Sequence, residues 1–160
     1  MRTKAVFLFV ALFLPVGIFI FLKFFGENEF DVPALYIDTP PPVDAGCPAV
    51  ELPYAVADSV WNQLPTGHSL TLIYVGNASN AVENMLNRIQ NQVRSLPVGV
   101  VRLVPDERNT RWKDCVFFLE DPSDMVLVDS ERLIRGQYIS TDRKEVDRLL
   151  TEIDILLKNY

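Results

Sequence analysis

An uninterrupted apolar run near the N-terminus limits most strongly what this chain can be. From Ala5 to Leu22, 18 consecutive residues carry no charge, and nearly all are apolar. At a rise of about 1.5 Å per residue, a helix of this length crosses a hydrocarbon core about 30 Å thick. A surface helix of a soluble domain would have a polar face, which this run lacks. We therefore expect residues 1–25 to form a transmembrane signal-anchor helix that contacts the lipid bilayer through residues 5–25.

The charges on either side of the run predict its orientation. Arg2 and Lys4 precede it, whereas Glu27, Glu29 and Asp31 follow it. Because basic residues are retained on the cytoplasmic side, we expect the N-terminus in the cytoplasm and the rest of the chain on the outer side. A cleaved signal peptide is the competing interpretation. Its apolar region would be about 7–15 residues long and would end at a small-residue site, whereas this run is longer and no Ala-x-Ala follows it.

The remainder of the chain is strongly acidic. The whole sequence has 15 Lys and Arg residues and 21 Asp and Glu residues. Residues 1–26 hold three of the cations and no acid, so residues 27–160 hold 12 cations and 21 acids, a net charge of −9. Such a domain repels the phosphate backbone of DNA and RNA, so we expect no nucleic acid among its partners.

A proline run marks an irregular segment after the apolar run. Residues 40–42 are three consecutive prolines, which favour an extended and semi-rigid backbone. We expect residues 26–56 to form an extended, Pro-rich lead-in or stalk. The folded domain is then expected over residues 57–160.

The first half of this domain has the pattern of two buried strands joined by a helix. Apolar, β-rich runs cover residues 70–75 and 98–104. Between them, Asn80 with Glu83 resembles a capping arrangement for the start of a helix. The apolar face of that helix consists of Val82, Met85, Leu86, Ile89 and Val93. A strand, helix and strand within about 35 residues predict a right-handed βαβ unit.

The second half predicts a hairpin and a final helix. Residues 105–114 are polar and are expected to form a loop. Residues 125–129 and 133–138 have the pattern of the two strands of a hairpin. Asp142 with Glu145 can cap the helix that follows. The order βαβ then ββα is that of a thioredoxin-like α/β fold, a mixed sheet with flanking helices. The apolar stripe of the last helix consists of Val146, Leu149, Leu150, Ile153, Leu156 and Leu157.

Cys47 and Cys115 are the only cysteines, and His68 is the only histidine. This inventory is too small for a conventional four-ligand zinc site. One interpretation of the cysteines is a disulfide that pins the lead-in to the domain by closing a loop of roughly 70 residues. The alternatives are a redox or copper-binding pair and two separate thiols. His68 lies in a polar stretch before the first strand, and we expect it to be an exposed loop residue.

No residue set predicts catalysis. The sequence has no nucleophile arrangement, no phosphate-binding glycine loop and no informatively spaced carboxylate pair. Asp106, Glu107 and Arg108 are expected to be solvated loop charges, and Trp61 and Trp112 are expected to pack in the interior. We therefore predict no catalytic residue and no small-molecule substrate.

The segment from Val126 to Lys158 resembles the C-terminal end of the SCO/SenC family. It reads VLVDSERLIRGQYISTDRKEVDRLLTEIDILLK. Members of that family are membrane-anchored, thioredoxin-like proteins associated with copper delivery to cytochrome c oxidase. Residues 104–110 also resemble the family's Asp-Pro-Glu-Arg-Asp-Thr stretch, and the anchor with the residues up to Pro33 is similar to SCO-type proteins of some bacteria. The resemblance implies a bacterial inner-membrane protein with its C-terminal domain in the periplasm.

The family's metal ligands are missing from this chain. SCO proteins carry a CxxxC motif where the first core strand turns into its helix, but the region from Tyr74 to Met85 contains no cysteine. They also use a histidine before the hairpin, where this chain has Glu120 to Asp124. Cu(I) prefers thiolate and thioether donors, which amide and hydroxyl side chains do not replace. No ligand is carried over, and we expect neither metal nor cofactor.

These observations lead to one functional expectation and two alternatives. The expectation is a degenerate SCO-like protein that is not an enzyme and acts as an interaction or assembly factor for a respiratory cytochrome oxidase. The first alternative is a thiol–disulfide or copper-handling protein that uses Cys47 and Cys115. The second is a structural accessory subunit of a membrane complex.

Overall fold

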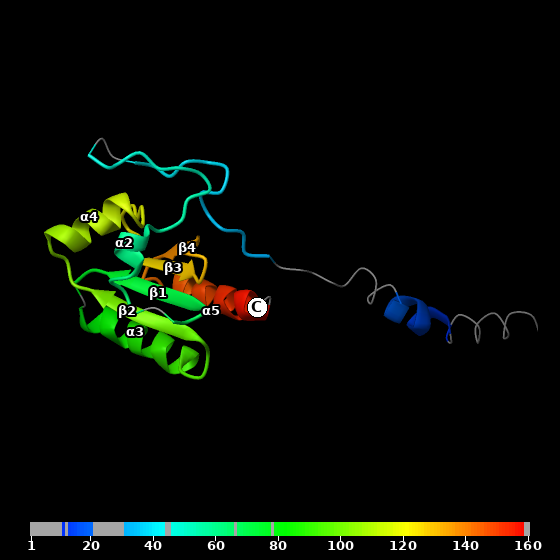
Figure 1. The fold of residues 1–160 in the computed structure, drawn as a ribbon. Helices are drawn as coiled ribbons and strands as arrows, with labels where there is room; N and C mark the ends of the chain where they lie inside the picture. Colours follow the sequence, from blue (N-terminus) through cyan, green and yellow to red (C-terminus); the bar gives the residue numbers. More distant parts are fainter. Residues whose placement is uncertain are drawn as a thin grey trace, which may run out of the picture. The chain divides into compact units, whose positions relative to one another are not determined.

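The computed structural model describes residues 11, 13–20, 31–43, 46–65, 67–77 and 79–158 (Figure 1). It divides into two compact units, Met1–Asp31 and Val32–Tyr160. In the first unit, residues 11 and 13–20 are helical, and their large apolar side chains are exposed. The rest of the anchor predicted over residues 1–25 lies outside the described residues. Within the described ranges, no helix combines the length and the apolar character that a membrane crossing requires.

A four-stranded mixed sheet forms the centre of the second unit. β1 runs parallel to β2, with Leu70 opposite Val98, and antiparallel to β3, with Leu70 opposite Asp129. β3 and β4 are antiparallel neighbours, so the sheet order is β2-β1-β3-β4. All residues of β1 and β3 are buried, as expected for central strands covered on both faces. The predicted strands are thus confirmed as β1 (Leu70–Val75), β2 (Val98–Leu103), β3 (Met125–Asp129) and β4 (Ile134–Tyr138).

Helices cover both faces of this sheet (Figure 1). Successive side chains of a strand point to opposite faces. Leu72 and Leu127 therefore pack with α3 and α5, whereas Ile73 and Val126 pack with α2 and α4. The predicted helices at α3 and α5 are confirmed, and α2 is a short helix that the sequence pattern does not indicate. The helices are α2 (Asp58–Trp61), α3 (Asn80–Val93), α4 (Glu107–Cys115) and α5 (Arg143–Lys158).

The predicted loop over residues 105–114 is wrong, because most of it is helix α4. The Asp106 carboxylate accepts a hydrogen bond from the Asn109 backbone N–H at 2.6 Å and caps the helix. Only Asn109 and Trp112 of this helix are buried, so it has no apolar stripe to give a helical period. The start of α3 also differs from the prediction, since Ser79 rather than Asn80 is its N-cap and accepts from the Val82 N–H.

The lead-in is irregular, as its prolines predict, but from Val32 on it belongs to the domain. Val32, Tyr54 and Val56 are buried. The Leu35 N–H donates to the Ile134 carbonyl at 2.7 Å, and the Val56 N–H donates to the Arg132 carbonyl at 2.9 Å. The two ends of this segment, at Leu35 and Val56, are therefore hydrogen-bonded to the hairpin.

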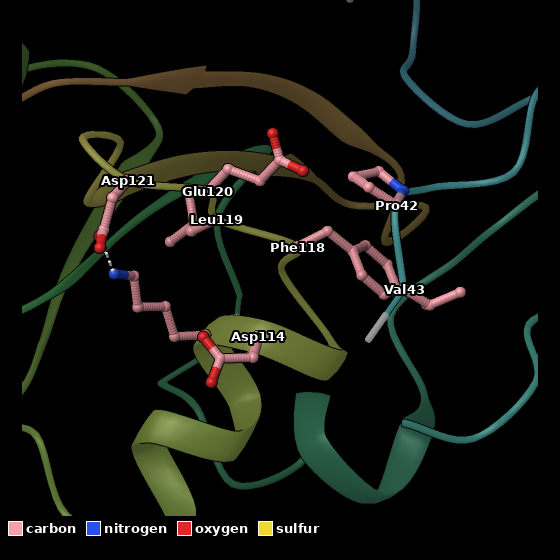
Figure 2. A pocket seen from close by; sticks show the side chains of 8 residues that line it. Pro42, Val43, Asp114, Phe118, Leu119, Glu120 and Asp121 are labelled. Carbon is pink, nitrogen blue, oxygen red and sulfur yellow. Dashed lines mark hydrogen bonds and ion pairs between the residues drawn. The ribbon is translucent and has the colours of Figure 1, made fainter. Parts of the chain in front are cut away.

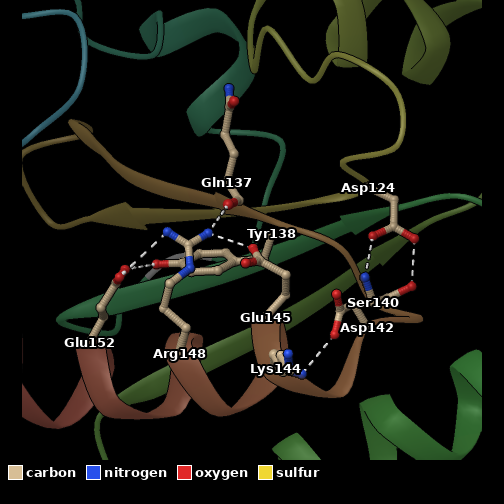
Figure 3. Close-up of polar contacts among 9 residues, drawn as sticks. All are labelled: Asp124, Gln137, Tyr138, Ser140, Asp142, Lys144, Glu145, Arg148 and Glu152. Atoms are coloured by element: carbon tan, nitrogen blue, oxygen red, sulfur yellow. Dashed lines mark hydrogen bonds and ion pairs between the residues drawn. The ribbon is translucent and has the colours of Figure 1, made fainter.

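Polar contacts fix α5 to the sheet (Figure 3). The Asp142 carboxylate accepts from the Lys144 N–H at 2.8 Å, so Asp142 caps the helix as predicted. The Arg148 guanidinium lies 4.6 Å from the centroid of the Tyr138 ring and donates to the Gln137 carbonyl at 2.8 Å. Burial and a hydrogen bond to Glu152 raise the pKa of the Tyr138 hydroxyl. The last helix is therefore held by charge as well as by its apolar face.

Candidate functional site

A disulfide joins Cys47 to Cys115 and uses both cysteines of the chain. Cys115 is the last residue of α4, and Cys47 lies on a loop between Ile37 and Pro53, of which residues 37–43 and 46–53 are described. We call residues 37–53 the pinned loop. Both half-cystines are half-buried and line a hollow of about 340 Å³ beside Glu107 and Arg111 of α4. The sequence leaves open whether Cys47 and Cys115 form a disulfide or remain two separate thiols, and in the structure they form a disulfide.

The base of the pinned loop is also fixed to the domain. The Tyr54 N–H donates to the Tyr36 carbonyl at 2.9 Å and closes the loop. The rings of Tyr36 and Tyr54 both contact Phe118 edge-on, with centroids 5.5 and 4.9 Å away. The side chain of Gln137 donates to the Phe118 carbonyl at 2.9 Å. The loop is therefore held at its base by aromatic packing and near its tip by the disulfide.

At the turn from β1 into α3, the hydrogen bonds of the described residues hold the backbone and cap the helix. Ser79 caps α3, and the Gly76 N–H donates to the Leu103 carbonyl at 3.1 Å. A Cβ atom at Gly76 would come within 2.5 Å of the Tyr74 hydroxyl, which explains the glycine. Asn77 and Asn80 are exposed. The cysteines lie on the pinned loop and at the end of α4, not at this turn.

The loop before β3 is fixed by Asp124. Its carboxylate accepts from the Ser140 backbone N–H at 2.7 Å and from the Ser140 hydroxyl (Figure 3). Its backbone carbonyl accepts from the Val75 N–H at 2.9 Å. Asp124 thus connects β1, this loop and the end of β4, and its carboxylate and carbonyl oxygens all accept hydrogen bonds within the domain.

His68 and the cysteines are not brought together. His68 is exposed and lines a separate hollow with Trp61 and Ser130. Its ring lies over Gly99, where an added Cβ would come within 2.7 Å of the imidazole Cδ2. In the part of the chain that the structure describes, no three His, Cys, Asp or Glu side chains are grouped so that they could hold a metal ion.

The remaining residues predicted from the sequence lie around α4. Asp106, Glu107 and Arg108 are exposed as predicted, although on a helix start and not in a loop. The Arg108 guanidinium lies 4.9 Å from the centre of the Trp112 ring. Trp61 and Trp112 are buried as predicted, with 9% and 8% exposure. Trp61 of α2 and Trp112 of α4 therefore pack in one apolar cluster with Ile73 and Val126 of the sheet.

The structure also contains a groove that the sequence does not predict (Figure 2). It lies between the pinned loop and the residues around the end of α4 and has a volume of about 370 Å³. The Lys113 ammonium in this groove lies 2.6 Å from the Asp121 carboxylate, so its charge is paired. That contact also lowers the pKa of the Asp121 carboxyl. We call it the loop groove; its lining consists of Pro42, Val43, Lys113, Asp114, Phe118, Leu119, Glu120 and Asp121.

Tyr54, at the base of the pinned loop, should make stability depend on alkaline pH. It is 8% exposed, its hydroxyl donates to the Val116 carbonyl at 2.8 Å, and burial raises its pKa to about 12. Between its unfolded pKa of about 10 and its folded pKa, the folded chain keeps a proton that the unfolded chain releases. The contribution of Tyr54 to the free energy of unfolding should therefore be fully present below pH 10. It should fall by roughly 1.4 kcal/mol per pH unit as the pH rises from the unfolded pKa to the folded pKa.

Urea unfolding at several pH values between 8 and 12 measures this dependence. Tyr138 contributes with the same sign, since burial raises its pKa too. The control is therefore Tyr54→Phe, which keeps the ring and should make the fall shallower. If the free energy of unfolding of Tyr54→Phe fell equally steeply with pH, groups other than Tyr54 would be responsible for the loss of stability at alkaline pH.

Comparisons with protein-family models and with curated proteins found no match for this chain. The resemblance to the SCO/SenC family therefore remains a prediction from its residues. The structure adds two neighbouring features on which a function can be built, the disulfide-pinned loop and the loop groove.

Proposed function

We propose that this chain is a membrane-tethered, SCO-type protein with a thioredoxin-like domain in the periplasm, and that it serves as a non-catalytic interaction or assembly factor for a respiratory cytochrome oxidase. The mixed four-stranded sheet with helices on both faces is compatible with a thioredoxin-like core. The tether and its orientation rest on the apolar run and its flanking charges. The choice of a respiratory oxidase as the partner rests on the family resemblance.

The disulfide is the observation that carries the non-catalytic part of this proposal. It occupies both sulfur atoms that the chain's cysteines could offer to Cu(I) or to a disulfide substrate. It also joins the lead-in to α4, which is a structural task. What the domain then offers to other molecules is its surface, and the pinned loop is the part of that surface that the disulfide shapes.

Copper titration and co-purification test the proposal. The full-length protein in dodecyl maltoside is titrated into the complex of Cu(I) with bicinchoninate, and we expect it to withdraw no copper. The same protein, affinity-purified from its own membranes in mild detergent, should bring a haem–copper oxidase with it. Stoichiometric withdrawal of Cu(I) at sub-micromolar affinity, or an oxidase that stays behind, would refute the proposal.

A second candidate function is thiol–disulfide or copper handling by Cys47 and Cys115. The favouring observation is that both residues are half-buried beside an open hollow, where a dithiol can approach them. Reduction by dithiothreitol without denaturant, followed by thiol labelling, separates the two functions. Rapid reduction of the folded protein favours redox work, whereas reduction only on unfolding favours the structural disulfide.

A further inference from the structure

We propose that the chain forms a dimer in which β2 of one copy pairs antiparallel with β2 of a second copy, so that the two sheets join into one. This inference goes beyond the proposed function and does not depend on the oxidase as partner. Four observations carry it: the open backbone at this edge of the sheet, the match of the edge to itself, the uncharged surface of α3 beside it and the local charge.

The outer edge of β2 has backbone groups without partners. β2 is the last strand at one end of the sheet order β2-β1-β3-β4 (Figure 1). The Gly76 N–H at the end of β1 donates to the Leu103 carbonyl, so Leu103 and every second residue before it face β1. The N–H and C=O groups of Val100 and Arg102 therefore point away from the sheet. Among the described residues, no hydrogen bond from another segment reaches them.

The other edge of the sheet is not left open in this way. There the lead-in donates backbone hydrogen bonds to the carbonyls of Arg132 and Ile134, at the start of β4. β2 also lacks the features that commonly protect an edge strand, since it has no proline and no lysine, and its register with β1 is uninterrupted. Its one charge is turned onto α3, because the Arg102 guanidinium donates to the Glu83 carboxylate at 2.8 Å. The edge is therefore free to pair with another strand.

The edge of β2 matches a second copy of itself. A two-fold axis at Val100 places Val100 opposite Val100 of the second copy, and Val98 opposite Arg102 of the second copy. Each of these pairs exchanges two hydrogen bonds through its outward groups. No like charges lie opposite each other, because each Arg102 faces a valine. Val104 follows β2 and is 69% exposed, and this pairing places it toward the start of β2 in the second copy, where its apolar surface is covered.

Helix α3 presents an uncharged surface beside this edge. It packs on the face of the sheet that carries Val98 and Val100, and its Asn87 accepts from the Arg102 guanidinium at 3.3 Å. Two-fold pairing places the α3 helices of both copies on the same face of the joined sheet. Amide side chains both donate and accept, so the two helices can meet without removing a charge from water. The exposed residues of α3 are Asn80, Ala81, Asn84, Asn87, Gln90, Asn91 and Gln92.

The part of the chain that carries the open edge is not acidic. Residues 67–105, which contain β1, α3 and β2, hold one acid and three cations. The other residues of the range 27–160 therefore hold 20 acids and nine cations, a net charge of −11. Two copies of an acidic domain repel each other. Pairing along β2 brings the two least acidic parts together and keeps the acidic parts of the copies farther apart.

Oligomeric state and hydrogen exchange of the full-length protein in dodecyl maltoside test this inference. Light scattering after size-exclusion chromatography should give the protein mass of two chains. The Val100 and Arg102 amides should exchange about tenfold more slowly in concentrated protein than on dilution, whereas the inward Val101 amide should not respond. A single chain at about 100 μM would overturn the proposal. So would a dimer in which the Val100 and Arg102 amides exchange freely, because the copies would then meet at another surface.

Variants at the edge locate the contact. Val100→Pro removes an N–H that the single chain does not use and should weaken the dimer about tenfold or more. Its control, Val100→Thr, keeps the branched shape and the N–H and should dimerise like the unchanged protein. Because proline also restricts the strand itself, Val104→Lys gives a second test at an exposed position. It should weaken the dimer without changing the urea midpoint of the diluted protein. Dimers that survive both Val100→Pro and Val104→Lys would contradict the proposal.

A strand of another protein is the alternative occupant of this edge, and the same measurements detect it. In that case a single chain purified with its partner would show slow Val100 exchange that does not change with the concentration of the complex. That result would remove the second copy from the edge. Failure of the dimer leaves the proposed function standing, because that function is tested by copper titration and by recovery of an oxidase. An oxidase that stays behind equally leaves the dimer standing.

Discussion

Replacing Cys47 and Cys115 together by serine should lower the free energy of unfolding by about 4 kcal/mol. The disulfide joins residues 68 positions apart, so it closes a long loop in the unfolded chain. In the chain-entropy description, the cross-link stabilises the protein by removing conformations from the unfolded state, and this gain grows slowly with loop length. The loss is measured by urea unfolding of the full-length protein in detergent, followed by the fluorescence of its buried tryptophans.

Reduction supplies the control for this variant. The unchanged protein with dithiothreitol should lose the same free energy, while the serine variant should not respond to the reductant. Amides of residues 46–53 should also exchange hydrogen faster in the variant, because the pin near the loop tip is gone. A loss below about 1 kcal/mol would show that Tyr36, Tyr54 and Phe118 hold the loop without the disulfide.

The regular elements with strong apolar periodicity could be predicted from the sequence. Helices α3 and α5 bury one face with a period of three to four residues, whereas β1 and β3 are buried at every residue and form nearly continuous apolar runs. Helix α4 could not be found in this way, because it buries only Asn109 and Trp112. The sequence signal that α4 does carry is Asp106 as N-cap followed by Glu107 in the first turn. This signal is easily missed, because the surrounding residues are nearly all polar.

The candidate site could be predicted from the sequence only in part. The sequence singles out Cys47 and Cys115, but the choice between a bond and two thiols depends on the distance between their Cα atoms, which is 5.2 Å in the fold. The loop groove is a stronger example, since Val43 and Glu120, more than seventy positions apart in the sequence, line the same hollow. No local pattern encodes such a pairing. It follows from the hydrogen bonds of Leu35 and Val56 to the hairpin, in a segment for which the prolines predicted only an extended lead-in or stalk.

A second large effect is expected when Arg135 is replaced by methionine. The Asp129 carboxylate has 0% exposure and accepts from the Arg135 Nε at 2.7 Å and from the Leu133 N–H at 2.9 Å. Arg135 also donates to the Val32 carbonyl at 3.1 Å, where the lead-in joins the domain. Removal of the guanidinium leaves a buried carboxylate without its main counter-charge, which typically costs about 3–5 kcal/mol. The free energy of unfolding of Arg135→Met should fall by that amount.

Two comparisons separate a buried charge from lost packing. Arg102→Met breaks the exposed pair with Glu83, whose side chains are 35% and 39% exposed, and should cost at most about 1 kcal/mol. Asp129→Asn combined with Arg135→Met removes both charges of the pair and should be more stable than Arg135→Met alone, because the buried carboxylate that lost the guanidinium is then neutral. If the double variant were the less stable of the two, the loss would come from the packing of the arginine stem and its bond to the Val32 carbonyl. In that case the docking of the lead-in, and not the charge of Asp129, would be what Arg135 stabilises.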